Sequence, residues 1–210
     1  NRQQQAAGTV LIDIGAGTTN MVIIEDGEVQ HIAVIPMGGI HITNDLAIGL
    51  KTDLDIAEAV KLQHANLSGD TKRTRLSVTA NRKNHLFDPE EVHMIVEAGV
   101  EELFEYVDKE LKKIGRSRKL PGGVVLVGGS SKLPGLAEFA KEKLELAARI
   151  GTLQSVQGLK DTVNDPAFFT AAGLMLLDML LLPDGSAARF SSHPGGITSV
   201  FEGLFKRLRK

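Results

Sequence analysis

The chain has 210 residues, of which 42% are hydrophobic, a formal net charge of -2 and no cysteine. This composition predicts one large or two small globular domains with a sizeable core, and it excludes a largely disordered chain. The charge argues against a general nucleic-acid binder. The absence of cysteine excludes disulfides and thiolate metal sites, and it is compatible with a reducing cytoplasm.

Three β-rich segments follow the polar first residues. Residues 8–14, 21–26 and 28–36 each predict a strand, since they are rich in Val, Ile and Thr. Asp26 and Gly27, between the second and third segments, form a dipeptide that strongly favours a hairpin turn. We therefore expect the chain to begin with neighbouring strands joined by short turns.

Two helices are predicted next. Residues 38–50 place several apolar side chains on one side of a helix, and residues 54–65 form a second helical pattern. Asp53 is a plausible N-cap for the second helix. Glu58 and Lys61 stand one turn apart on it, which by itself predicts a surface ion pair worth well under ~1 kcal/mol.

The middle of the chain combines a polar region with a long helix. Residues 66–84 are polar, and only residues 75–80 among them resemble a strand. A long amphipathic helix follows, for which Asp88 is the predicted N-cap, Pro89 the first position and Gly115 the end.

The last third returns to alternating strands and helices. Residues 122–147 read as an apolar strand, a Gly-Gly turn and a helix, and residues 151–156 as another strand. An apolar helix is predicted after Asp165 and Pro166. Unbroken apolar strands alternating with helices predict a mixed or parallel sheet covered on both faces. Residues 183–196, small and polar, predict a flexible linker.

The first motif with chemical meaning is LIDIGAGTTN. Asp13 ends an apolar strand, where a carboxylate needs a backbone cap or a cation. Gly15 and Gly17 leave main-chain N–H groups uncovered, as in turns that approach phosphate oxygens, and Thr18 and Thr19 add hydroxyl donors. The alternative is an ordinary hairpin turn.

The second motif is VVLVGGSSKLPGL. A buried strand ends in Gly128 and Gly129, which would let a flat ligand lie against bare backbone. Ser130, Ser131 and Lys132 can donate hydrogen bonds at the edge of such a ligand. Taken alone, this pattern is more often a tight turn between a strand and a helix.

The third motif is the last stretch, ITSVFEGLFKRLRK. On a helix, one apolar stripe would consist of Ile197, Val200, Phe201, Leu204, Phe205 and Leu208. The basic residues at its end are Lys206, Arg207, Arg209 and Lys210. Against Glu202 they give this tip a charge of 4 − 1 = +3. This pattern is typical of an amphipathic helix on an anionic membrane; the alternatives are docking on the protein's own body or in a partner groove.

The first two motifs resemble the ATP-binding fold shared by actin, sugar kinases and Hsp70-type chaperones. More closely, VLIDIGAGTTN, AVIPMGGIHITNDLAIGL, AEAVK and NDPAFFTAAGL occur in the order and spacing of the FtsA family of bacterial cell division proteins. This resemblance covers nearly the whole chain. It implies an α/β fold that is one half of an actin-like (ribonuclease H-like) ATPase fold, with a small inserted α+β subdomain and a C-terminal amphipathic helix.

The resemblance also implies a domain organisation. Residues 8–65 and 120–182 would form the nucleotide-binding subdomain (2A-like), and residues 66–119 the inserted subdomain (2B-like). A flexible linker at 183–196 would lead to a membrane-targeting helix at 197–210.

ATP and magnesium are the cofactors that the resemblance implies. Asp13 would hold the magnesium ion through water. The residues implied at the β- and γ-phosphates are Gly15, Gly17, Thr18 and Thr19. Those implied at the ribose and base are Glu58, Lys61, Gly128, Gly129, Ser130 and, at the edge of the base, Lys132. The two glycine-bearing turns must therefore converge on one nucleotide.

Two features depart from the family pattern. The chain opens with NRQQQAAG and no initiator Met, so we expect Asn1 to be internal to a longer protein. The family's first phosphate loop is missing, which predicts very weak nucleotide binding by this chain and leaves no catalytic residue to nominate. In the long helix, Gly99 stands where relatives commonly carry a basic residue, in the subdomain that binds FtsZ in those relatives.

The function implied is an ATP-dependent, actin-like tether for cell division, a weak ATPase in its complete form. It would polymerise head to tail and hold FtsZ filaments, with other divisome proteins, to the cytoplasmic face of the membrane at the division site. The alternative is a small-molecule kinase of the sugar or acetate type, and a chaperone nucleotide domain ranks last. A kinase predicts an acid or base cluster, but the histidines are scattered: His31, His41, His64, His85, His93 and His193.

Overall fold

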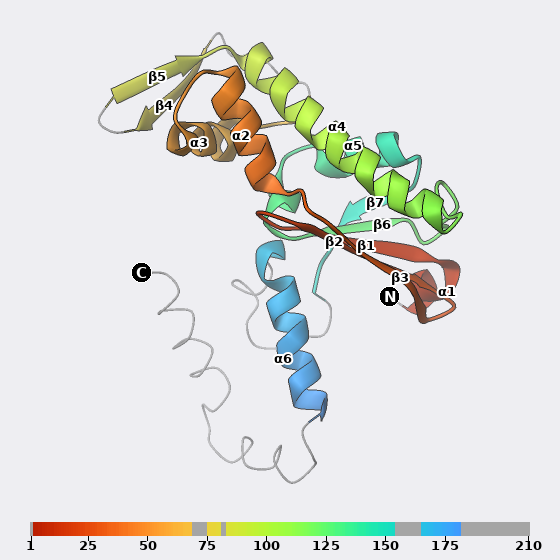
Figure 1. Cartoon of the computed structure of the whole chain (residues 1–210). Coiled ribbons are helices and arrows are strands. Elements are labelled where there is room, and N and C mark those ends of the chain that lie inside the picture. Colours follow the sequence, from red (N-terminus) through yellow and green to blue (C-terminus); the bar gives the residue numbers. More distant parts are fainter. Residues whose placement is uncertain (1, 69–74, 81–82, 154–164, 182–210) are drawn as a thin grey trace, which may run out of the picture. The chain divides into compact units, whose positions relative to one another are not determined.

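The computed structural model of the chain is shown in Figure 1. It describes residues 2–68, 75–80, 83–153 and 165–181. The predicted linker and amphipathic helix, residues 183–210, lie outside the described residues. The chain divides into two compact units, which are described separately.

The larger unit, Asn1–Gly151, is built on a mixed sheet of five strands. In spatial order these are β3 (Glu28–Ile35), β2 (Thr19–Glu25), β1 (Thr9–Ile14), β6 (Val124–Val127) and β7 (Ala148–Ile150). β1, β2 and β3 pair antiparallel, whereas β1, β6 and β7 run parallel. The predicted opening strands and the mixed sheet are confirmed.

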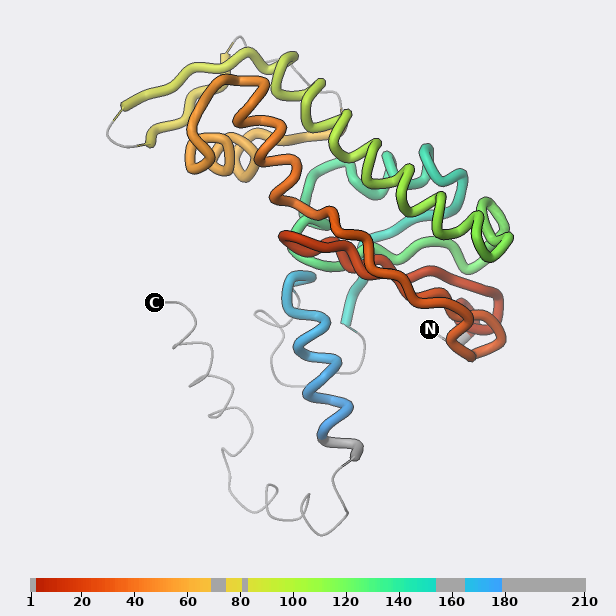
Figure 2. The backbone as a smooth tube through the Cα atoms, in the orientation of Figure 1, coloured from red at the N-terminus to blue at the C-terminus, as the bar shows by residue number. Residues whose placement is uncertain are grey.

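Helices cover one face of this sheet, as the tube in Figure 2 shows for the long helix. The helices of the unit are α1 (Arg2–Ala7), α2 (Gly39–Gly49), α3 (Leu54–His64), α4 (Pro89–Lys113), the short 3-10 helix η1 (Gly129–Lys132) and α5 (Leu136–Leu144). α4 packs against β3, α2 and α5, and α5 packs against β7. α1 was not predicted, because its segment is polar and short.

The core lies between the sheet and these helices. β1 contributes Val10, Ile12 and Ile14, alternate residues that are all buried. α4 meets them with residues spaced three or four apart, which lie on one side of a helix. Its buried side chains are Val92, Val96, Val100, Leu103, Phe104, Val107 and Leu111.

The opposite face of the sheet carries exposed apolar side chains within this unit. Leu11, Val22 and Ile32 are register partners on neighbouring strands, so their side chains share that face. Leu11 is 37% exposed and Ile32 is 64% exposed. Covering of both faces therefore stays a prediction.

The predicted ends of the long helix are confirmed. The Asp88 carboxylate accepts a hydrogen bond from the Glu90 backbone N–H at 2.8 Å, and Pro89 occupies the first turn. Gly115 follows the helix in the left-handed conformation, with φ of +67°. Asp53 also stands at the predicted N-cap of α3, but its side chain makes no capping hydrogen bond.

Two strand predictions need correction. The segment predicted as polar with a single strand forms a hairpin of β4 (Leu76–Ala80) and β5 (Lys83–Phe87). The sequence KNHLF has no β-branched residue, and pairing to β4 supplies what its local propensity lacks.

The strand expected at 151–156 is also misplaced. The strand that pairs with β6 is β7, three residues earlier, and residues 151–153 are not in a strand. α5 ends at Leu144, and Glu145 takes the left-handed conformation with φ of +51°, so the chain turns back to the sheet at once. Residues 154–156 lie outside the described residues.

The smaller unit, Thr152–Lys210, is described over residues 152–153 and 165–181. It contains the 3-10 helix η2 (Pro166–Phe168) and α6 (Phe169–Leu181). The Asp165 carboxylate accepts a hydrogen bond from the Ala167 N–H at 3.0 Å, which begins the predicted helix. Among the described residues, no helix is long and apolar enough to cross a membrane.

Candidate functional site

The two glycine-bearing turns lie side by side at one edge of the sheet. Asp13, at the end of β1, is the register partner of Val127, at the end of β6. Because the carboxyl ends of parallel strands meet at the same edge, the turns that follow leave the sheet together. The Ser130 hydroxyl donates a hydrogen bond to the Gly15 carbonyl oxygen at 3.3 Å. The two turns thus lie side by side as predicted, and their meeting on one nucleotide stays a prediction.

Gly128 makes this close approach possible. Its φ is +88° and its ψ is 169°, a conformation that is essentially restricted to glycine. A Cβ at this position would lie 2.3 Å from Asp13 Oδ1 and 2.5 Å from the Ile14 carbonyl oxygen. The second turn therefore packs its backbone directly against the first motif.

The first turn also rests on the start of α2. The backbone N–H of Gly39 donates to the Gly15 carbonyl at 3.0 Å, and that of Ile40 donates to the Ala16 carbonyl at 2.8 Å. A Cβ on Gly38 would lie 2.7 Å from both of these carbonyl oxygens. Sequence reasoning missed this support, although the Gly-Gly pair of PMGGIHI was a visible signal for close backbone packing.

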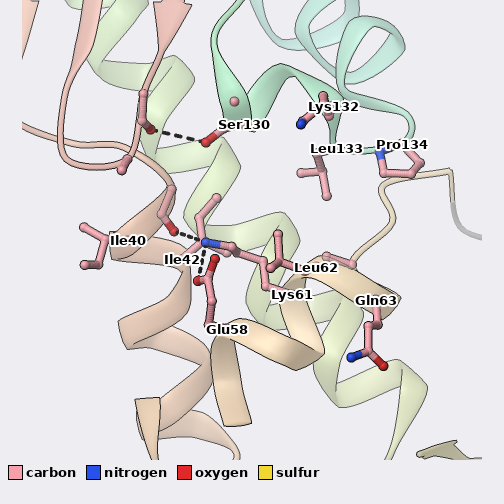
Figure 3. A pocket seen from close by; sticks show the side chains of 15 residues that line it. Ile40, Ile42, Glu58, Lys61, Leu62, Gln63, Ser130, Lys132, Leu133 and Pro134 are labelled. Carbon is pink, nitrogen blue, oxygen red and sulfur yellow. Dashed lines mark hydrogen bonds and ion pairs between the residues drawn. The ribbon is translucent and has the colours of Figure 1, made fainter. Parts of the chain in front are cut away.

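Glu58 and Lys61 project from α3 toward these turns and form a polar network (Figure 3). Lys61 Nζ lies 2.7 Å from Glu58 Oε2, and it donates to the Gly39 carbonyl at 2.8 Å and to Thr43 Oγ1 at 2.7 Å. The Thr43 hydroxyl also bonds to the Glu58 carboxylate. The Lys61 side chain is only 15% exposed. The pair is therefore part of a partly buried network, not an isolated surface ion pair.

The network sets the charge state of Glu58. Partial burial alone raises the pKa of the Glu58 carboxyl, but hydrogen bonds from Lys61 and Thr43 and the Lys61 charge outweigh it. The pKa therefore lies below its ordinary value, and the carboxylate is ionised at neutral pH. An ionised Glu58 can accept hydrogen bonds from the hydroxyls of a ligand.

A cavity of about 670 Å³ opens between α3, the first turn and η1. It has the size of a pocket for a nucleotide-sized molecule. The predicted site residues that line it are Gly15, Glu58, Lys61, Gly129, Ser130 and Lys132. Sequence reasoning missed its apolar walls, which include Ile40, Ile42, Leu62, Leu133 and Pro134. Figure 3 shows Leu133 and Pro134 across the cavity from Leu62.

The other predicted residues stand outside the lining. Asp13 and Gly128 lie behind it, at the ends of their strands, and Gly17 and Thr18 are exposed at the tip of the first turn. Thr19 is fully buried, and its hydroxyl donates to the Met37 carbonyl at 2.8 Å. The prediction that this hydroxyl faces the ligand is therefore corrected: it holds β2 to the segment that precedes α2.

Gly99, the position of the expected basic residue in α4, faces α2. A Cβ there would lie 3.2 Å from Asp45 Oδ2 and 3.4 Å from Ile42 Cγ1. Gly99 is buried, so this position lies in the helix-helix contact and not on a free surface. A partner would have to contact other positions of α4.

Asp45 lines a second, smaller cavity of about 380 Å³ together with His41, Glu102 and Tyr106. Burial raises the pKa of the Asp45 carboxyl, the nearby Glu102 charge raises it further, and His41 opposes them in part. This cavity gathers negative charge beside α2, at a place that the sequence motifs did not indicate.

Comparisons with known proteins extend these observations. The family model described as "Cell division protein FtsA" matches residues 10–173. The chain is 34% identical to the cell division protein FtsA of Pseudomonas aeruginosa over an alignment 211 residues long, which covers 99% of this chain and 51% of that protein. It is 35% identical to that of Neisseria meningitidis over 200 residues, 90% of this chain and 48% of that protein. The chain thus spans about half the length of these curated relatives.

Solved structures share the fold at lower identity. MreB5 of Spiroplasma citri, in a structure bound to ADP, matches with a TM-score of 0.67 and 17% identity, covering 85% of this chain and 55% of that one. The MamK double helical filament matches with a TM-score of 0.63 and 24% identity, covering 83% and 55%. These likenesses establish the actin-like fold.

Proposed function

The chain belongs to the FtsA family of cell division proteins, and we propose that its cavity forms one wall of a site for ATP and magnesium. The observation that supports this proposal best is the Ser130–Gly15 hydrogen bond, which joins two bare-backbone turns beside a cavity of about 670 Å³. Backbone without side chains can approach phosphates and a flat base closely. The MreB5 structure of the same fold is bound to ADP, in keeping with the proposal.

Each part of the cavity has a proposed role. The turn of residues 15–18, whose backbone is exposed at 16–18, would face the β- and γ-phosphates, and Asp13 would hold magnesium through water. Glu58, ionised at neutral pH, accepts hydrogen bonds from the ribose hydroxyls, while Lys61 flanks the adenine. Magnesium, when bound, would neutralise part of the phosphate charge.

The base would lie against the opposite wall. Gly129 offers bare backbone for it and Leu133 adds apolar surface, while Ser130 and Lys132 stand at its edge. Gly128, behind the lining, would support this part of the site through the bend of the turn. Because the chain spans about half of its relatives' length, it supplies only part of the contacts to a nucleotide, and we expect weak affinity.

Titration of the chain with ATP and magnesium, followed by backbone amide NMR, tests this proposal. We expect shifts confined to residues 15–18, the start of α2, α3 around Glu58 and Lys61, and η1, with binding in the millimolar range. Asp13→Ala should weaken the magnesium-dependent part of binding. Lys113→Gln, on the exposed end of α4, is the matched control and should leave binding unchanged. Shifts elsewhere, or equal binding by Asp13→Ala, would contradict the phosphate assignment.

We further propose that this protein polymerises and tethers FtsZ filaments to the cytoplasmic face of the membrane at the division site, with other divisome proteins. The family assignment and the filament-forming MamK neighbour support self-association. The inserted segment 66–119 would bind FtsZ. Residues 197–210, which lie outside the described residues, carry the apolar and basic sequence pattern expected of a helix bound to anionic lipid.

The membrane proposal can be tested by flotation with vesicles that contain anionic lipid. The whole chain should float, whereas a chain ending at Pro183 should not. A variant in which Lys206, Arg207, Arg209 and Lys210 are changed to Gln should float less. Raised salt should likewise reduce the flotation of the whole chain. Equal flotation of the whole and shortened chains would remove residues 197–210 from the proposal.

A further inference from the structure

Thr43 is a buried polar residue at the centre of the network behind the cavity. It lies on α2, is 3% exposed, and does not line the cavity itself. Its hydroxyl oxygen accepts a hydrogen bond from Lys61 Nζ at 2.7 Å, bonds to the Glu58 carboxylate, and lies 3.2 Å from the Gly39 carbonyl oxygen. Neither the sequence motifs nor the comparisons give this residue a role.

A threonine hydroxyl has a single proton to donate. Two acceptors compete for it, the Gly39 carbonyl and the Glu58 carboxylate, and the charged acceptor forms the stronger bond. The proton therefore points to Glu58, while the oxygen lone pairs face the Lys61 ammonium. Thr43 thus meets an anion and a cation at once and holds both side chains in one arrangement.

The same network reaches the first turn. Lys61 donates to the Gly39 carbonyl at 2.8 Å, and the Gly39 N–H donates to the Gly15 carbonyl at 3.0 Å. Gly15 in turn accepts the Ser130 hydroxyl. An unbroken path of hydrogen bonds therefore runs from α3 through the start of α2 to both glycine-bearing turns.

We propose that Thr43 is a positioning residue of the nucleotide site: its hydroxyl orients the Glu58 carboxylate and the Lys61 ammonium toward the ligand and ties them to the turn at Gly15. This inference rests on the proposed function, because it assumes that Glu58 and Lys61 face a nucleotide. Thr43 itself does not touch the ligand.

The experiment compares Thr43→Val, which keeps the shape and removes the hydroxyl, with Thr43→Ser, which keeps the hydroxyl. The pKa of the Glu58 carboxyl is measured by carbon-detected NMR titration without nucleotide, and ATP-magnesium affinity is measured in parallel. In Thr43→Val the pKa of Glu58 should rise and the affinity should fall about tenfold, equivalent to about 1.4 kcal/mol. In Thr43→Ser both should stay close to those of the unchanged protein.

Thr9→Val is the matched control. Thr9 is also a buried threonine, and its hydroxyl donates to the Gly123 carbonyl at 2.8 Å, on β1 away from the cavity lining. It should destabilise the fold without moving the pKa of Glu58. Should Thr43→Val not fold, Thr43→Ala replaces it.

An unchanged pKa of Glu58 in the variant without the hydroxyl, or an equal shift in Thr9→Val, would overturn the role of Thr43. If the unchanged protein shows no ATP-magnesium binding at all, the proposed function fails instead. The titration of Glu58, which needs no nucleotide, still decides whether Thr43 orients that carboxylate.

Discussion

A Cβ atom at Gly128 would lie 2.3 Å from the Asp13 carboxylate, well inside van der Waals contact. The backbone of one turn thus occupies the space that a side chain would need, and the two motifs are fitted to each other.

Gly128→Ala should therefore destabilise the protein. The backbone conformation at this position is strained for any residue that has a Cβ, which costs about 1–3 kcal/mol. The clash of that Cβ with Asp13 adds to this cost. We expect a loss of at least 2 kcal/mol or so in the free energy of unfolding, measured with urea. Gly17→Ala is the control, because a Cβ at Gly17 meets no atom within 4 Å. Equal losses would show that the contact with Asp13 is unimportant.

Removing the side chain at the N-cap of α4 or of α3 should have different effects on stability. Asp88→Ala removes a capping hydrogen bond of 2.8 Å to the Glu90 N–H and should cost about 1 kcal/mol. Asp53→Ala removes a side chain that makes no such bond, so its cost should be a few tenths of a kcal/mol. Thermal unfolding of both variants measures the difference. A larger loss for Asp53→Ala would contradict this assignment of the caps.

Glu110 should support the fold at neutral pH and not in acid. Its hydrogen bond from Lys113 lowers the pKa of the carboxyl, burial opposes this, and His31 adds to the lowering. A carboxyl whose pKa is lower in the folded state stabilises the protein above its unfolded pKa of about 4.3, and this contribution is lost as pH falls through the folded value.

Glu110→Gln tests this linkage. The variant should be less stable than the unchanged protein at pH 7, and the difference should shrink as pH falls below the unfolded pKa and vanish below the lowered folded pKa. Urea unfolding at several pH values measures it. A difference that persists in acid would assign the effect to packing of the side chain and not to its charge.

At Asp45 we expect the opposite change of stability with pH. Its pKa is raised by burial and by the charge of Glu102, so its carboxyl favours the fold only while protonated. That stability is present below the unfolded pKa and is lost as pH rises through the folded pKa. Asp45→Asn should therefore stabilise the protein at pH 7 by about 0.5–1 kcal/mol and have little effect near pH 3. A loss of stability at pH 7 would show that the carboxylate has a favourable partner.

Local signals in the sequence predicted much of the fold. The Asp26-Gly27 turn, the Asp88 cap and the apolar stripe of α4 each act within a few residues of their position, so the sequence displays them directly. β5 and β7 were missed or misplaced because their pairing partners, not their own residues, fix where these strands form.

The site was predictable to a lesser degree. The turns at Gly15 and Gly128 carry recognisable glycine patterns, and family resemblance indicated Glu58 and Lys61. Thr43 gave no signal, because a threonine within a helix has many possible roles and only the fold brings this one to Glu58. Thr19 did stand in a recognisable motif, but its hydroxyl bonds to the Met37 carbonyl inside the protein, which the sequence does not display.

The Ser130–Gly15 contact joins residues that are 115 positions apart in the sequence. It can close only after β6 has aligned beside β1, one of the longest-range steps in assembling the sheet. The pocket therefore forms only together with the β1–β6 pairing. A molecule that binds there binds only the folded unit. It should therefore raise the melting temperature of the whole unit and not stabilise one loop alone.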